Sequence, residues 1–411
     1  MINFRQYPNM TKCIIPSGIT MSSYISASNW FNNLSNLKEV SLPNSVIVMS
    51  FTFNNCDSLT EAICPPKVSD MTSTYKDCDS LVTAICGDTV YNMRYTYQNC
   101  RNLITPVCGS KVTDMSGTYS GCINLTTAVC GPRVTDMSDA YEGCTSLKTA
   151  VCGPNVTNMH GTYYGCKNLT TAVCVDNVKV MNQAYYGCTN LTTAVCGSNV
   201  IYMREAYRNC TNLTTAVCGP NVTNMHSTYY GCTNLTTAVC GPKLTNMAST
   251  YYGCTNLTTA VCGDNVVSMS ATYRDCTNLT TAVCGDNVTS MSDVYTNCTN
   301  LTTAVCGPNV NYFGFAYYGC RNLTTAYLYS SNVTNVRSCF YRGFGPNRLN
   351  IYVPAGSITN NTVHWTNSDS MVSTSVTWTY DAVNNCSYNT EQNIYIYPVA
   401  NVEAARIANG D

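Results

Sequence analysis

Residues 213–234, LTTAVCGPNVTNMHSTYYGCTN, decide the fold, because the same 22-residue pattern recurs along most of the chain. Its opening leucine returns every 22 residues from Leu37 to Leu323, which makes fourteen units. Self-similarity at a fixed period is typical of solenoids, in which each unit packs only against its neighbours. The 411 residues therefore predict a repetitive array rather than several globular domains.

The first six residues of the unit predict one short parallel strand per coil. With the leucine counted as the first position, positions one, four and six hold Leu, Ala and Cys. Alternate side chains of a strand point to opposite faces. We therefore expect Ala216 and Cys218 to be buried, and Thr215 and Val217 to face outward.

The second half of the unit predicts one short helical or 3₁₀ turn per coil. Val222, Met225 and Tyr229 are spaced by three and four residues, as on the inner side of a helical turn. In the thirteen units that open at Leu37 to Leu301, position nineteen holds only Gly, Asn or Asp, which tolerate the left-handed backbone of a helix C-terminal cap. Pairs such as Gly263 and Asp264 are expected to form a similar turn where the strand ends. The predicted fold is a leucine-rich-repeat-like β-solenoid.

The 28 cysteines fall almost entirely into two columns with steps of 22 residues. One column runs from Cys56 to Cys320 and the other from Cys64 to Cys306. Stacked coils would give neighbouring cysteines parallel Cβ directions, which do not favour disulfides. The chain has no CxxC pair and only three His, so zinc signatures are absent. We expect buried, free thiols that act as small apolar side chains, and assembly in a reducing compartment.

Composition excludes several classes of function. A net charge of −1 with 10% charged residues argues against nucleic acid or an anionic membrane as partner. No apolar run approaches the roughly 20 residues that span a bilayer, and residues 1–18 lack the pattern of a classical secretory signal. We find no Ser/His/Asp or Cys/His arrangement and no phosphate-binding loop. We expect a protein that is not an enzyme, binds no metal or cofactor and does not insert into membranes.

The run MxxTYYGCTNLTTAVC resembles the BspA-like (Treponema pallidum type) leucine-rich repeats, whose units read roughly AFxGCxxLxxIxIPxxVxxI. Residues 31–49 and 349–357 are the stretches most similar to that family. The chain departs from the pattern by carrying Ala and Cys where Ile is usual, and Tyr where Phe is usual. The resemblance implies a solenoid and a role in adhesion to proteins, cells or extracellular matrix, and it brings no catalytic residue with it.

The ends of the chain depart from the repeat and predict caps. We expect residues 1–36 to form an N-terminal cap with a degenerate first rung, in which Asn3, Phe4, Tyr7 and Trp30 cover the exposed end. Residues 37–354 form the solenoid. Residues 355–411 form a C-terminal β cap or attachment module, because VHWTN, SVTWTYDA and NIYIYPV alternate like strands.

The outward side chains of the strand form the candidate binding face. Two explanations stay open: plain β-propensity in a duplicated unit, or a flat contact surface for a repetitive partner, with ice binding as a remote variant. The candidate residues are Thr127, Val129, Thr149, Val151, Thr171, Val173, Thr193, Val195, Thr215, Val217, Thr237 and Val239.

Two further features have simpler explanations. Charged residues such as Arg204, Glu205 and Arg208 sit where the repeats differ and predict a solvated convex face. Asn-Leu-Thr recurs from Asn168 to Asn322 and matches the glycosylation sequon, as a by-product of the repeat. We expect these asparagines to form a stacked ladder that satisfies backbone groups.

The predicted function is the display of a long repetitive surface for adhesion or receptor binding, foremost in a phage virion or tail appendage. The alternatives are a bacterial or protist cell-surface adhesin and an intracellular protein-interaction scaffold. The expected partners are a protein or glycan receptor and other virion proteins. The expected location is the virion surface, or else the cytoplasm or a non-classical export route.

Overall fold

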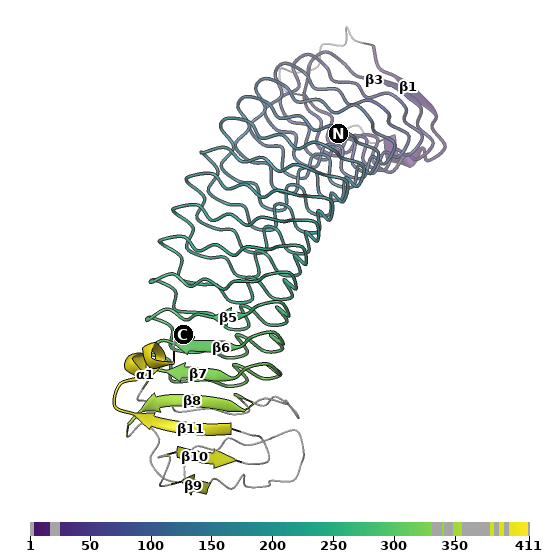
Figure 1. The fold of residues 1–411 in the computed structure, drawn as a ribbon. Helices are drawn as coiled ribbons and strands as arrows, with labels where there is room; N and C mark the ends of the chain where they lie inside the picture. Colours follow the sequence, from purple (N-terminus) through teal and green to yellow (C-terminus); the bar gives the residue numbers. More distant parts are fainter. Residues whose placement is uncertain are drawn as a thin grey trace. The chain divides into compact units, whose positions relative to one another are not determined.

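The computed structural model describes residues 4–16, 25–330, 339–340, 348–355, 379–381, 386–389 and 394–409. The chain has two compact units, Met1–Val200 and Ile201–Asp411. Within each unit, successive turns of the chain stack as parallel coils with a step of 22 residues (Figure 1). The predicted solenoid of parallel strands is confirmed, whereas the three-part domain division stays a prediction.

The first unit begins with a cap. It contains η1 (Phe4–Gln6), β1 (Lys12–Ile14), β2 (Ile25–Ser26), β3 (Glu39–Ser41) and β4 (Val46–Val48), with β1 parallel to β3 and β2 parallel to β4. Phe4 stacks on Phe31 with ring centroids 4.7 Å apart, and Trp30 is buried, so both help to cover the first coil. Tyr7 is 55% exposed and Asn3 lies outside the described residues, so their part in the cap stays a prediction.

The second unit ends in a seven-stranded sheet with the order β5-β6-β7-β8-β11-β10-β9. Its strands are β5 (Thr281–Ala282), β6 (Thr303–Cys306), β7 (Thr325–Leu328), β8 (Leu349–Pro354), β9 (Thr379–Asp381), β10 (Cys386–Asn389) and β11 (Ile394–Val399). Strands β5 to β8 and β11 are parallel neighbours, and β9 and β10 pair antiparallel. The helix α1 (Val402–Ala408) follows β11 (Figure 1).

These strands bear on the prediction for residues 355–411. The segment NIYIYPV forms β11, and SVTWTYDA contributes β9, so the expected β structure is present there. The segment VHWTN lies outside the described residues. Pairing of β11 with β8 continues the sheet of the solenoid, which is how a cap would protect its last strand.

In the coils between these two ends, strand pairing is reduced to single bridges. Thr at position three pairs with its counterpart one coil on, as in Thr149 with Thr171. A second column of bridges at position twelve joins residues such as Asp114 and Asp136. The sequence did not predict this second column, because these side chains vary from coil to coil.

The segment expected to be helical consists of consecutive hydrogen-bonded turns. Thr250 N–H donates to the Met247 carbonyl and Cys254 N–H to the Tyr251 carbonyl, the i to i−3 spacing of a β-turn. Ser249 and Gly253 have φ values of 53° and 71°, so each turn has a left-handed third residue and cannot continue into a helix. Position nineteen is left-handed as predicted, while the left-handed position fifteen has no sequence signal.

The core of each coil is built from the predicted columns. Leu213, Val222, Met225 and Tyr229 are all 0% exposed. The Tyr251 ring lies between two others, with centroids 5.7 Å from Tyr229 and 5.5 Å from Tyr273. Such offset stacks add to the burial of large apolar rings, so this column is a main source of cohesion between coils.

Candidate recognition surfaces

The strand face consists of the Thr at position three and the Val at position five of successive coils. All six candidate threonines are exposed, and all six candidate valines are half-buried. Thr171 pairs with Thr149 and Thr193, and Thr215 pairs with Thr237, so the threonines stand in register within each unit. The threonines are exposed as expected, whereas the valines, expected to face outward, are half-buried. The role of this face in binding stays a prediction.

Tyrosine hydroxyl groups hold the strand face from inside the coil. The Val239 N–H donates to the Tyr251 hydroxyl at 2.9 Å, and that hydroxyl donates to the Val239 carbonyl at 2.8 Å. The same pair of bonds joins Val261 to Tyr273. The valine N–H and carbonyl groups are hydrogen-bonded to a tyrosine of their own coil, so they do not pair with the strand segments of the neighbouring coils. This explains why the strand pairing is limited to isolated bridges. We call this arrangement the tyrosine clamp.

The outer thiol column, Cys64 to Cys306, packs against glycines of the next coil. Ala216 is buried as expected, but Cys218 is only half-buried, so that prediction was wrong. A Cβ added to Gly241 would lie 2.7 Å from Cys218 Sγ, and one added to Gly263 would lie 2.6 Å from Cys240 Sγ. The glycine at this position therefore makes room for sulfur. The Val266 N–H donates to the Gly263 carbonyl at 3.1 Å, so the turn predicted at Gly263 and Asp264 forms, although Gly263 itself has no left-handed φ.

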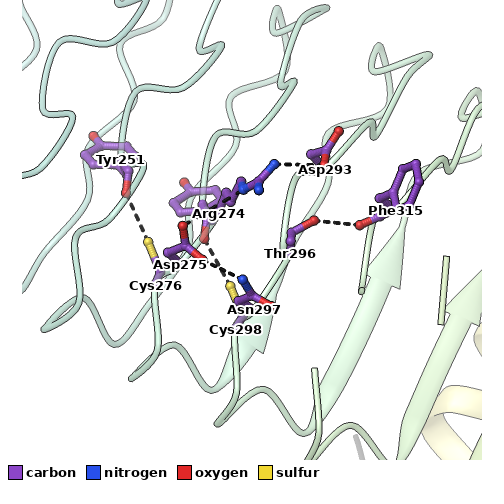
Figure 2. Close-up of polar contacts among 10 residues, drawn as sticks. Tyr251, Arg274, Asp275, Cys276, Asp293, Thr296, Asn297, Cys298 and Phe315 are labelled. Carbon is purple, nitrogen blue, oxygen red and sulfur yellow. Dashed lines mark hydrogen bonds and ion pairs between the residues drawn. The ribbon is translucent and has the colours of Figure 1, made fainter. Parts of the chain in front are cut away.

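The inner thiol column, Cys56 to Cys320, is fully buried and does more than fill space. The Cys276 thiol donates to the Tyr251 carbonyl, and the Cys298 thiol to the Tyr273 carbonyl, each at 3.0 Å (Figure 2). Each bond joins one coil to the preceding one. We expected these cysteines to act only as small apolar side chains and did not predict the hydrogen bonds. The sequence pattern does not show which backbone carbonyls lack a backbone N–H partner and can accept from a thiol.

Every described cysteine whose side chain is placed carries a free thiol. Burial raises the pKa of Cys86 to about 11 and that of Cys232 to about 12. A thiol must lose its proton to act as a nucleophile or a metal ligand, so these groups are unreactive at neutral pH. In the described part of the chain, no three His, Cys, Asp or Glu side chains are grouped to hold a metal ion.

The turn face consists of the variable side chains at positions fourteen, fifteen, eighteen and nineteen. Figure 2 shows a polar network in the second unit, in which Arg274 Nη1 lies 3.1 Å from Asp293 Oδ1. Asn297 donates to Asp275 at 2.8 Å one coil away. Arg204 is exposed, but Glu205 and Arg208 are half-buried. The charged residues that were predicted to be solvated are therefore only partly exposed to solvent.

Aromatic side chains on the turn face were not predicted. Tyr164 stacks on Tyr186, and Tyr230 on Tyr252, with ring centroids 4.5 Å apart in both pairs. The signal was present in the sequence, because tyrosine follows tyrosine only at positions seventeen and eighteen. The prediction covered only the tyrosine at position seventeen and gave position eighteen no role.

The asparagine ladder at position twenty-two is exposed and weak. Asn190 donates to Asn168, and Asn256 to Asn234, each at 3.5 Å. The ladder was predicted, but these bonds join side chains rather than side chain and backbone. Their length is at the limit for a hydrogen bond, so the ladder adds little stability.

No helix in the described part of the chain is long and apolar enough to cross a membrane. The repeated leucine-lined coils define the class of leucine-rich repeat solenoids, whose members are typically structural or recognition proteins. The model for the BspA-type leucine-rich repeat region matches residues 3–126, 115–236, 159–272 and 226–347. The chain therefore belongs to the BspA-type leucine-rich repeat family, which confirms the resemblance of its repeats.

The chain is similar to solved structures, of which the first described here shows the same fold. A leucine-rich repeat protein from Bacteroides ovatus is similar with a TM-score of 0.57 and 18% identity, over 77% of this chain and 78% of the other. A leucine-rich cell surface protein from Faecalibacterium prausnitzii gives 0.45 and 19%, over 66% and 86%. Identity at this level shows the fold alone. Among curated proteins, none matches the chain.

Proposed function

We propose that the chain is a recognition protein whose strand face binds a repetitive protein or glycan receptor. The single observation that supports this most is the in-register ladder of exposed threonines, held by the tyrosine clamp behind it. Each coil offers the same small contact, so a partner that spans several coils gains affinity through effective concentration. No chemistry at the site is required.

The test replaces Thr215, Thr237 and Thr259 with Glu, one, two and three at a time, and measures binding to panels of purified cell-surface proteins and glycans. These threonines are exposed, so the charges leave the fold intact. The half-buried Val217 and Val239 are poorer targets, because a charge there also costs stability. We expect a stepwise loss of affinity with each coil altered.

A matched control replaces Arg204, Glu205 and Arg208 on the turn face with Ala, and we expect receptor binding to persist. Loss of binding with the control but not with the threonine variants would assign the receptor to the turn face. Complete loss from any one threonine would point to a single contact instead of a repetitive one.

We propose that the protein is a component of a phage virion or tail appendage. The alternative is a cell-surface adhesin. The free, buried thiols support assembly before exposure to an oxidising environment. Capsid or tail genes beside the coding gene would support the virion. Their absence from several sequenced neighbourhoods would favour the adhesin.

A further inference from the structure

Four consecutive coils of the second unit carry Arg208, Tyr230, Tyr252 and Arg274 at position eighteen. The guanidinium carbon of Arg208 lies 4.1 Å from the ring centre of Tyr230. The Tyr230 and Tyr252 rings are stacked at 4.5 Å with an angle of 12°, and Arg274 lies 5.7 Å from the Tyr252 ring centre. All four are half-buried, so their edges reach solvent. We call these residues the Tyr-Arg stack.

The backbone beneath the Tyr-Arg stack is held in place by hydrogen bonds. Tyr230 N–H donates to the Ser227 carbonyl, Tyr252 N–H to the Ser249 carbonyl, and Gly231 N–H to the Tyr252 carbonyl of the next coil. The rings are further fixed by stacking on one another. A surface that is already ordered loses little entropy when it binds a partner.

The composition of this region is that of a protein-binding surface. The turns REAYRN, HSTYYG, ASTYYG and SATYRD, at residues 204–209, 226–231, 248–253 and 270–275, present Tyr or Arg outward at position eighteen, whereas their tyrosines at position seventeen are buried. Antibody paratopes use these same residues, and Tyr and Arg dominate the energetic hot spots of protein interfaces. Thr and Val, which form the strand face, are under-represented among hot spots.

Geometry and charge favour a protein over a glycan or a polyanion. Sugar rings bind to open aromatic faces, but here the facing sides of the two tyrosines cover each other, and the arginines lie over the outer sides. Of the arginines in this region, Arg274 is paired with Asp293 at 3.1 Å and Arg204 with Glu205 at 3.3 Å. A polyanion would require an excess of positive charge.

His226 is half-buried on the turn face and occupies position fourteen, one coil after Arg204. Burial, together with the positive charges of Arg204 and Arg208, lowers its pKa, so the imidazole is neutral at pH 7. The neutral ring offers one donor and one acceptor to a partner.

We infer that the Tyr-Arg stack, with Arg204 and His226, forms a second interaction surface, separate from the strand face, that binds a folded protein. The tyrosine edges supply the central contact, and the charged pairs supply the polar rim.

The experiment selects a phage-displayed library of random cyclic peptides, as probes of protein-like contacts, against the full chain. The chain carries Thr215→Glu, Thr237→Glu and Thr259→Glu, so that the strand face cannot capture peptides. We expect enriched peptides to lose at least about thirtyfold in affinity when Tyr230 and Tyr252 are both replaced with Ser, a typical hot-spot effect. A second variant, Arg204→Gln with Arg208→Gln, should lose about tenfold and leaves both rings in place.

The matched control is Tyr91→Ser, which removes a tyrosine that is 51% exposed and lies outside the stack. We expect it to leave affinity unchanged, and thermal melts confirm that each variant is folded. Failure to enrich any peptide, or equal binding to all variants, would overturn the inference. Tyrosine-dependent binding of the same chain on a glycan array would assign the surface to carbohydrate instead.

Discussion

The coil that contains Phe53 and the next coil, which contains Tyr75 at the same position, hold their strand segments differently. In the first, β3 pairs with β1 over three residues. In the second, Ile63 exchanges both backbone hydrogen bonds with the Tyr75 hydroxyl, and no strand forms there. Phenylalanine has no hydroxyl, so its coil leaves the backbone free to pair with a neighbouring coil.

The second unit offers a similar comparison between two neighbouring coils that both carry tyrosine at this position. Val283 is bound to the Tyr295 hydroxyl, and β5 ends at Ala282, one residue earlier. In the next coil the Tyr317 hydroxyl instead contacts Cys306 Sγ at 2.9 Å, and β6 extends through Val305 to Cys306. A side-chain hydroxyl thus competes with the neighbouring coil for the same backbone groups. The hydroxyl is what replaces strand pairing in the central coils.

The largest effect we predict is alkaline unfolding of the cysteine-lined coils. Burial raises the pKa of Cys166 and Cys232 to about 12, above about 8.5 for an unfolded thiol. The unfolded chain therefore binds fewer protons as pH rises above about 8.5. Stability should fall from there up to about pH 12, by about 1.4 kcal/mol per pH unit for each such thiol.

Circular dichroism against pH measures this unfolding, and hydrogen exchange locates it. Strands β8 and β11 contain no cysteine, so their protection should outlast that of the coils. Unfolding that begins in β8 and β11, or stability that is constant up to pH 12, would contradict the account.

Removal of a ring from the tyrosine column should be the next largest effect. Tyr251→Ala leaves a cavity between the Tyr229 and Tyr273 rings and should cost about 3–5 kcal/mol. Phe53→Ala removes a similar ring without a hydroxyl and should cost less, because no backbone partner is lost. Urea denaturation measures both, and an equal cost would show that the clamp contributes nothing.

The contact between sulfur and glycine gives a smaller effect with an internal control. Gly263→Ala places a Cβ 2.6 Å from Cys240 Sγ and should cost about 1–3 kcal/mol through overpacking. Adding Cys240→Ala should restore most of that loss. Gly285→Ala also meets the Gly263 carbonyl oxygen at 3.0 Å, so Cys262→Ala should rescue it poorly. Equal rescue at both sites, measured by thermal melts, would rule out this explanation.

The repeat period, the core columns and the left-handed position nineteen were predictable, because each follows from residue type at fixed spacing. The tyrosine clamp was not, since Tyr229 fits the core equally well as an apolar ring. Left-handed residues such as Ser249 and Ala271 could not be predicted either, because hydrogen bonds between coils impose them. Of the candidate site, the exposure of Thr215 was predicted, and the stack of Tyr230 on Tyr252 was missed.

The most direct test of the tyrosine clamp is amide hydrogen exchange in Tyr251→Phe, the mildest of these changes. Loss of the hydroxyl leaves the Val239 N–H without its 2.9 Å partner and should cost about 1–2 kcal/mol. We predict that exchange at Val239 accelerates by about tenfold or more, while exchange at Val261, held by Tyr273, stays as it was. Unchanged exchange at Val239, or an equal change at both valines, would contradict the clamp.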